Sequence, residues 1–321
     1  MKKRRGLQII LGIISFIFIF FLIVNVIPFS KNGNKEAWLK DDNVKICAHR
    51  GGSELNPENT EKAFDYVIIE TDFVDIVEMD VRLTKDEIIV MCHDSTVNDF
   101  ALDEDSSDIR ISEFSFEELR KYNMGKNFVD REGNKPYYDL KDNEIVENGL
   151  SIMSVDNFLN KYKEVRDFLV VVDLKDSFEG NQKIVTMINN MITSNELSWW
   201  TNRLLFISFD DKTVDFISEK FPHLYVGALG NKAAYEVAFQ KLLLSAFYKV
   251  NYDALVIPYD FDIFGINISC STKSISKMTK KRNQILSYYT INDVEEMKKL
   301  IEIDADIITT DAPDILFELL N

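Results

Sequence analysis

The sequence contains few of the residues that build disulfide frameworks, cysteine-based metal clusters and nucleic-acid-binding surfaces. Its three cysteines, Cys47, Cys92 and Cys270, are far apart and odd in number, which excludes both a disulfide framework and a close-spaced metal pattern. We therefore expect three unpaired thiols. Basic side chains number 37 against 53 acidic ones, for a formal net charge of -16. Such a surface repels phosphate backbones, so no nucleic-acid partner is expected.

Apolar material is abundant enough for one large α/β domain, since 46% of the 321 residues are hydrophobic. Short β-rich runs alternate with amphipathic stretches such as residues 212–220 and 294–301, a rhythm typical of parallel α/β folds. Eight runs are predicted to be parallel strands, the number found in a (β/α)8 TIM barrel. They are residues 44–49, 75–80, 168–173, 203–208, 224–229, 254–258, 285–289 and 306–310.

Two segments depart from the simple alternation. The second strand runs on to Leu83, and residues 88–93 are predicted to return beside it as a hairpin. Residues 94–149 form a long polar excursion with a predicted helix at 115–122. Because a structureless loop of that length is unusual in a compact barrel, we interpret it as a small inserted subdomain near the active face of a barrel spanning residues 43–321.

The N-terminus carries an almost unbroken apolar run at residues 7–28, preceded by a basic cluster at residues 2–5. A transmembrane helix needs about 20 apolar residues, whereas a cleavable signal has a shorter core and small residues at its cleavage site. Residues 24–29 offer no such site, so an uncleaved anchor is favoured over a cleaved signal or a buried soluble helix. The sequence predicts a single-pass cell-membrane protein with a cytoplasmic tip and anchor (1–30), a polar stalk (31–42) and an extracytoplasmic catalytic domain.

The first candidate site residues stand where the first predicted strand ends, in His49-Arg50-Gly51-Gly52. Arg50 offers paired donors for phosphate oxygens, and His49 can exchange a proton near neutral pH. Glycines allow a ligand close to the backbone. Asn56 and Pro57 then resemble a helix start, which places Glu58 and Asn59 either at the mouth of the site or in a simple helix initiator.

The second predicted strand places Glu78, Asp80 and Arg82 on one face and apolar residues on the other. Two neighbouring buried carboxylates are unfavourable unless a cation lies between them. Oxygen ligands favour one hard divalent cation, Ca²⁺ or Mg²⁺. The alternative is a solvated edge strand, which the wholly apolar opposite face disfavours.

Two further strand ends carry candidate residues. The hairpin return ends in His93, followed by Asp94, which is placed to orient the imidazole. The next strand ends with Asp173 and Lys175 on one side. Either Asp173 is a further cation ligand and Lys175 binds phosphate, or the two residues form an ordinary ion pair.

Together these residues resemble the glycerophosphodiester phosphodiesterase family: His49-Arg50-Gly51, the Pro57-Glu58-Asn59-Thr60 segment, Glu78-x-Asp80 and His93-Asp94, in that order. The resemblance continues through 117–119, Gly125, 208–210, 289–292 and 307–313, and so covers nearly everything after residue 43.

The resemblance implies a TIM barrel that hydrolyses glycerophosphodiesters to an alcohol and glycerol 3-phosphate with one divalent cation. It further implies His49 as general base, His93 as general acid, Glu78 and Asp80 as cation ligands, and Arg50 and Lys175 as phosphate-binding groups. The family usually has glutamate where Asp173 stands and tryptophan where Tyr289 stands. Tyr289 keeps an aromatic wall for the glycerol moiety and adds a hydroxyl.

Two alternatives remain open at the level of sequence. One is a phospholipase-type phosphodiesterase acting on lysophospholipid or phosphoinositide head groups, for which residues 261–266 would form an apolar rim or, alternatively, a packed loop. The other is a catalytically silent module that binds glycerophosphate groups, which retention of both histidines and both second-strand carboxylates disfavours.

Overall fold

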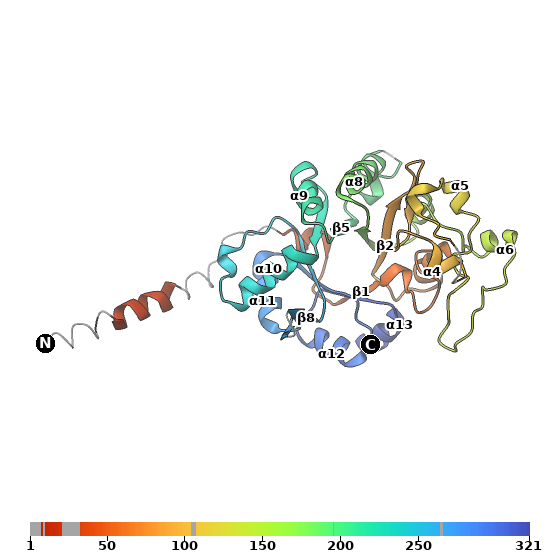
Figure 1. Cartoon of the computed structure of the whole chain (residues 1–321). Coiled ribbons are helices and arrows are strands. Elements are labelled where there is room, and N and C mark those ends of the chain that lie inside the picture. Colours follow the sequence, from red (N-terminus) through yellow and green to blue (C-terminus); the bar gives the residue numbers. More distant parts are fainter. Residues whose placement is uncertain (1–7, 9, 21–32, 104–106, 195, 264–265) are drawn as a thin grey trace.

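The computed structural model of the chain describes residues 8, 10–20, 33–103, 107–194, 196–263 and 266–321. At its centre a sheet of parallel strands closes on itself, because β1 pairs with both β11 and β2 (Figure 1). All eight predicted barrel strands are confirmed. Their bounds are β1 Lys45–Ala48, β2 Ile76–Leu83, β4 Leu169–Leu174, β5 Leu204–Ser208, β6 Tyr225–Ala228, β7 Ala254–Ile257, β10 Ile285–Tyr288 and β11 Ile307–Thr310.

Helices surround the barrel and cover the outward face of its strands (Figure 1). They are α3 Glu61–Asp65 with the π-turn Tyr66–Glu70, α7 Val155–Tyr162, α8 Phe178–Ile192, η4 Ser198–Trp200, α9 Asp211–Lys220, α10 Gly230–Lys241, η5 Ser245–Phe247, α11 Lys273–Arg282, α12 Val294–Glu302 and α13 Pro313–Leu320. On β2, Val77, Met79 and Val81 enter this outer apolar layer. Successive strand residues point to opposite faces, so Glu78 and Asp80 face the barrel interior.

The segment before β1 closes the end of the barrel at which the strands begin. There α2 (Lys35–Trp38) places Trp38 in an interior cluster with Cys47, its ring 6.3 Å from the ring of Tyr225. Lys35 Nζ forms a buried ion pair with Asp306 Oδ1 at 2.8 Å. The described part of the predicted stalk is thus docked onto this end, here called the bottom of the barrel.

The predicted hairpin is confirmed, since β3 (Ile89–Met91) pairs antiparallel with β2. Beyond it lie α4 Asn98–Ala101, η3 Ile111–Glu113, α5 Phe116–Leu119 and α6 Asp142–Glu147, beside a separate small core that includes Val90 and Leu119. Helix α5 is shorter than predicted because Tyr122 N bonds to Leu119 O in a tighter turn.

Residues 10–20 are helical, and their large apolar side chains are exposed. The rest of the predicted anchor, including residues 21–28, lies outside the described residues. No helix within the described part of the chain is long and apolar enough to cross a membrane. Of residues 261–266, interpreted as a rim or a packed loop, 264 and 265 lie outside the described residues. The others belong to the paired strands β8 (Asp260–Ile263) and β9 (Ile266–Ser269), and Phe261 packs against the outer core. The three cysteines are free, as predicted, and all three are buried.

Candidate active site

The first element of the site is the turn that follows β1, η1 (His49–Gly51). Arg50 has a left-handed φ of 55°, and Gly51 and Gly52 have φ values of 84° and 87°. A Cβ on Gly51 would lie 2.9 Å from the Cβ of Ala63, so the close packing of α3 requires glycine there. This turn directs the backbone N–H of Arg50 to Glu78 Oε2 at 2.8 Å, which links the end of β1 to the carboxylates of β2.

His49 is held by a carboxylate from the last strand of the barrel. Its Nδ1 lies 2.6 Å from Asp311 Oδ1, while Ser53 Oγ and Asn292 Nδ2 donate to the same carboxylate. Burial would raise the pKa of Asp311, but the hydrogen bond from His49 and its charge outweigh burial and lower the pKa to about 2. Burial likewise opposes protonation of His49, yet Asp311 and Glu78 raise its pKa. Asp311 therefore fixes the ring and stabilises its protonated form.

Three buried carboxylates, Glu78, Asp80 and Asp173, converge next to this histidine, with oxygen atoms within 4.8 Å of one another. Burial and the charge of Asp80 raise the pKa of Glu78 to about 8. Burial would also raise the pKa of Asp80, but Lys175 and Arg50 lower it. Asp173 Oδ1 is buried without a hydrogen-bond partner among the described residues. This shorter side chain thus reaches the cluster although the family usually has glutamate.

Two cationic side chains lie against the carboxylate cluster. Lys175 Nζ is 2.6 Å from Asp173 Oδ2 and 3.1 Å from Asp80 Oδ1. Arg50 Nη1 donates to both oxygens of Glu58, and its Nε lies 3.2 Å from Asp80 Oδ2. With Glu58 included, four carboxyl groups face two cations, so the site has room for further positive charge.

His93 lies at the end of β3 and its side chain is 35% exposed, more open than His49. Its Nδ1 is 2.7 Å from Asp94 Oδ1, as the sequence suggested for this neighbour. Burial raises the pKa of Asp173, while the charges of Lys175 and His93 act in the opposite direction, which places His93 within electrostatic reach of the cluster.

Arg82 contacts backbone carbonyls and does not join the carboxylates that face the barrel interior. Its Nε and Nη2 donate to the carbonyl of His93 at 3.0 and 2.7 Å, and its Nη1 donates to the carbonyl of Lys175 at 2.8 Å. The guanidinium therefore holds the backbone of both of these site residues in place.

An aromatic wall completes the site. A narrow enclosed space of about 30 Å³ is lined by His49, Glu78, Asp173 and Tyr289, among others. The Tyr289 ring lies 6.1 Å from that of Phe209, which is 50% exposed. Burial raises the pKa of the Tyr289 hydroxyl to about 12, so it stays neutral near pH 7. Phe209 had no assigned role in the sequence analysis.

The predicted helix start at Asn56 and Pro57 is wrong. Helix α3 begins at Glu61, and its cap is Thr60, whose side chain accepts from Ala63 N. The physical reason is Asn59, whose left-handed φ of 56° interrupts any helix from residue 57. Asn59 instead exchanges hydrogen bonds with Asp80, donating to Oδ2 and accepting from the backbone N–H. Asn59 therefore lies at the mouth, the first of its two predicted positions, and it positions Asp80.

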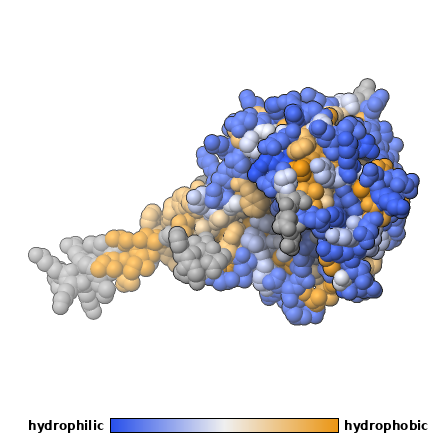
Figure 2. Space-filling view, turned by 45° about the vertical axis from the view of Figure 1, so that its right-hand side comes forward, coloured by the Kyte–Doolittle hydropathy of each residue, from blue (hydrophilic) through white to orange (hydrophobic). Residues whose placement is uncertain are grey.

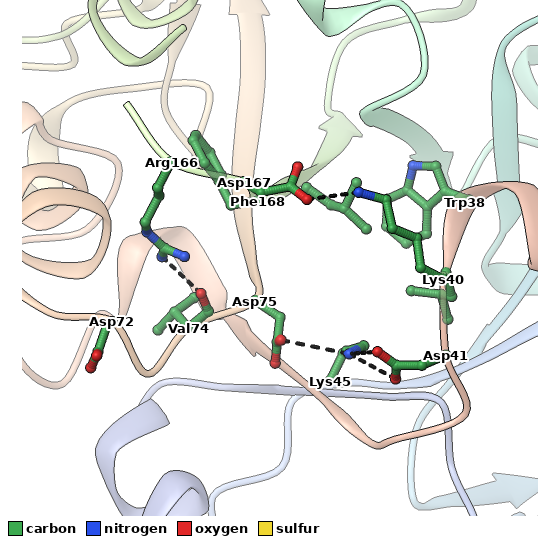
Figure 3. A pocket seen from close by; sticks show the side chains of 12 residues that line it. Trp38, Lys40, Asp41, Lys45, Asp72, Val74, Asp75, Arg166, Asp167 and Phe168 are labelled. Carbon is green, nitrogen blue, oxygen red and sulfur yellow. Dashed lines mark hydrogen bonds and ion pairs between the residues drawn. The ribbon is translucent and has the colours of Figure 1, made fainter. Parts of the chain in front are cut away.

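Figure 3 shows a larger hollow, of about 330 Å³, at the bottom of the barrel. Its lysines are paired, Lys40 with Asp167 at 2.7 Å and Lys45 with Asp41 at 2.9 Å. Arg166 donates to three backbone carbonyls. With its cations already satisfied, this hollow is a weaker candidate for chemistry than the opposite end of the barrel.

The chain is similar to known proteins over most of its length. Residues 49–315 match the sequence profile described as the glycerophosphoryl diester phosphodiesterase family. The chain is 25% identical over 280 residues to a glycerophosphodiester phosphodiesterase of Caldanaerobacter subterraneus, covering 86% of this chain and 97% of that protein. It is 22% identical over 274 residues to one of Bacillus altitudinis, covering 84% and 96%.

Solved structures show the same fold. The glycerophosphoryl diester phosphodiesterase domain of a Mycobacterium tuberculosis protein aligns with a TM-score of 0.68 and 13% identity, covering 87% of this chain and 100% of that chain. A Silicibacter pomeroyi structure aligns with a TM-score of 0.64 and 16% identity, covering 90% and 96%.

Proposed function

We propose a metal-dependent, two-histidine mechanism for this chain, which belongs to the glycerophosphodiester phosphodiesterase family and is therefore a phosphoric diester hydrolase. In this proposal it hydrolyses glycerophosphodiesters to an alcohol and glycerol 3-phosphate. The observation that carries the mechanism is the contact between Arg50 N and Glu78, which holds the turn bearing His49 against the carboxylate cluster.

The donor set fits one divalent cation, Ca²⁺ or Mg²⁺. All three proposed ligands, Glu78, Asp80 and Asp173, are oxygen donors, and Asp173 Oδ1 is buried with no hydrogen-bond partner in the described chain. A bound cation would neutralise the carboxylates and the phosphate oxygens of the substrate.

The histidines supply the proton transfers. His49 accepts a proton from the nucleophile, either water or the neighbouring glycerol hydroxyl, as it attacks phosphorus. The bond from phosphorus to the alcohol oxygen breaks, and His93 donates a proton to that oxygen. With the glycerol hydroxyl as nucleophile, water then opens a cyclic phosphate, so the net reaction consumes one water in both cases.

The remaining residues bind and orient the substrate. Lys175, next to the cluster, and Arg50 neutralise phosphate oxygens, and Glu58 aligns the guanidinium through two hydrogen bonds of 2.9 and 3.0 Å. Tyr289 and Phe209 form the wall against the glycerol moiety.

A substrate panel tests this proposal. The full chain is incubated with glycerophosphocholine, lysophospholipid and polyglycerol phosphate, with Ca²⁺ or Mg²⁺ and with chelator. We expect release of glycerol 3-phosphate that chelator stops and added cation restores. Turnover confined to lysophospholipid would instead support a phospholipase-type activity, and full activity in chelator would contradict the cation site.

We also propose that residues 7–28 anchor the protein in the cell membrane once, with the N-terminus in the cytoplasm and the catalytic domain outside. The basic cluster and the length of the apolar run support this topology. Protease added to intact cells should remove the catalytic domain while alkaline washing leaves the protein in the membrane. Resistance to protease in intact cells but not in lysed cells would contradict the topology.

A further inference from the structure

We infer that the last residue of α10 and the loop that follows it, residues 241–249, lie in the surface of a lipid bilayer beside the N-terminal helix, so that the catalytic mouth opens away from the membrane. This inference rests on the proposed membrane anchor and goes beyond it. It assigns the orientation of the barrel and, through that, the side from which substrate arrives.

The loop presents an unusual concentration of apolar surface. Leu242 and Leu243 are 66% and 59% exposed, the highest values among the large hydrophobic side chains described between residues 33 and 321. In the same loop, Phe247 is 53% exposed. Adjacent exposed apolar side chains of this size mark interaction surfaces rather than ordinary solvated loops.

Leu243 is also conformationally unfavourable. Its φ of 60° lies in the left-handed region, just after the end of α10, where glycine or asparagine is the usual residue. A leucine there is strained by about 1 kcal/mol, and its side chain remains 59% exposed. The leucine therefore stands at the surface in a backbone conformation that glycine or asparagine adopts more easily.

A buried ion pair holds the loop in its shape. Arg282 Nη1 lies 2.6 Å from Glu236 Oε1, and both side chains are buried. The Nη2 atom of the same guanidinium donates to the carbonyls of Ser245 and Tyr248. The loop is thus a built surface whose apolar residues are presented by a fixed backbone.

A bilayer is the occupant that the surroundings favour. The ring of Phe247 lies 6.2 Å from that of Phe20, so the loop meets the predicted membrane-spanning run directly. Figure 2 shows apolar surface on this N-terminal helix where it approaches the barrel. Exposed Lys241 and Lys249 flank the apolar residues, an arrangement that suits anionic head groups at a membrane surface even though the whole chain is strongly acidic.

The docked N-terminal segment gives the same orientation. Gly33 N donates to Arg282 O, and Asn34 N donates to Asp253 Oδ1, both at the bottom of the barrel. From residue 28, where the apolar run ends, to Gly33 the chain can reach at most about 18 Å. The bottom must therefore lie near the bilayer, while His49 and His93 lie at the strand ends that face away from it. This orientation favours water-soluble glycerophosphodiesters over lipids of the same membrane.

Fluorescent labels at single introduced cysteines test the orientation in the full chain. The native cysteines are buried, so labels attach selectively to Leu242→Cys, Phe247→Cys and the control Val146→Cys, which lies on α6 and matches Phe247 at 53% exposure. Each protein is reconstituted in vesicles of phosphatidylcholine and phosphatidylglycerol. We expect brominated lipid to quench the labels at 242 and 247 and aqueous iodide to quench the label at 146.

Each other outcome is decisive. Iodide quenching at 242 and 247 equal to that at 146, in protein that sediments with the vesicles, overturns the loop proposal alone. Labels shielded from both quenchers indicate a protein contact and also overturn it. Protein that does not sediment with vesicles overturns the anchor as well. Hydrolysis of glycerophosphocholine, measured on the same samples, reports the catalytic proposal separately.

Discussion

At the bottom of the barrel Lys35 and Asp306 form a buried ion pair of 2.8 Å, whereas at the mouth Glu78, Asp80 and Asp173 crowd together against Lys175 and Arg50. The bottom has matched charges and an apolar floor around Trp38. Among the described residues, the mouth keeps a buried carboxylate oxygen of Asp173 without a hydrogen-bond partner, and burial raises the pKa of Glu78 there to about 8. The paired charges at the bottom maintain the fold, whereas the crowded carboxylates at the mouth are available for binding a ligand.

The largest expected effect on turnover comes from replacing a histidine at the mouth of the barrel, compared with replacing the histidine at the bottom. His49→Ala or His93→Ala should each lower kcat by about 10²- to 10⁴-fold, because each removes a proton-transfer group. His223→Ala is the matched control, since the third histidine is exposed, follows α9 at the bottom and contacts only Asn189 among the hydrogen bonds described. Steady-state release of glycerol 3-phosphate measures all three. A His93→Ala enzyme with most of its activity would show that the assigned acid is wrong.

The converse experiment changes the bottom and spares the mouth. Lys35→Ala leaves Asp306 buried and unpaired, which should lower the free energy of unfolding by about 3–5 kcal/mol. Turnover per folded molecule should not change, because the pair lies at the other end of the barrel. Chemical denaturation and active-site-normalised kcat measure the two quantities.

Asp42→Ala provides the control for Lys35. It removes the second, 89% exposed partner of the same lysine and should lower the free energy of unfolding far less than Lys35→Ala does, because solvent screens an exposed ion pair. Equal destabilisation by both variants would mean that burial of the pair with Asp306 is not what matters.

A smaller effect concerns proton release at the mouth. Because burial raises the pKa of Glu78 from 4.5 to about 8, the cation-free folded protein binds one proton more than the unfolded protein between pH 4.5 and 8. The free energy of unfolding therefore falls as pH rises through that interval. Cation binding requires the carboxylate, so at pH 7 it should release close to one proton and much less at pH 9. Calorimetry of Ca²⁺ or Mg²⁺ binding in buffers of different ionisation enthalpy measures this release.

Glu78→Gln sharpens the same test. The amide cannot release a proton, and cation affinity should fall by more than the roughly 10- to 100-fold that loss of an outer-shell partner produces. Unchanged proton release in this variant would assign the proton to another group, such as Asp173, whose pKa burial also raises.

The mouth of the barrel could be predicted from the sequence more fully than the bottom, and the reason is physical. Strand periodicity placed Glu78 and Asp80 on one face, and the abrupt ends of apolar strands marked His49, His93 and Asp173. These signals are local, so all eight strands and the carboxylate cluster could be predicted. The stalk interpretation gave no hint that Trp38 fills the barrel floor, because its burial depends on strands that are distant in sequence.

The same limit applies to the partners of the site residues. Asp311 stands 262 positions from the histidine that it orients, and only barrel closure brings them together. The sequence left Asn59 either in a helix initiator or at the mouth, and its left-handed backbone and exchange of hydrogen bonds with Asp80 appear only once the segment packs against β2. Residue types at strand ends can be read from sequence, but the second layer that orients them cannot.

The smallest expected effect concerns the ion pair of His49 and Asp311. This pair stabilises the fold only over a limited pH range, because low pH protonates Asp311 and high pH deprotonates His49. Asp311 has its pKa lowered from 3.8 to about 2, so its contribution is present above pH 4 and is lost as pH falls toward 2. His49 has its pKa raised above 6.5, so the same pair weakens again as pH rises through that raised value. Because the pKa of Asp311 is lowered by this much, Asp311→Asn should lower the free energy of unfolding by about 2 kcal/mol near pH 5 and by progressively less toward pH 2. Thermal unfolding of both proteins across this range measures the difference, and a difference that stays constant down to pH 2 would mean that packing, rather than the charge on Asp311, stabilises this side of the mouth.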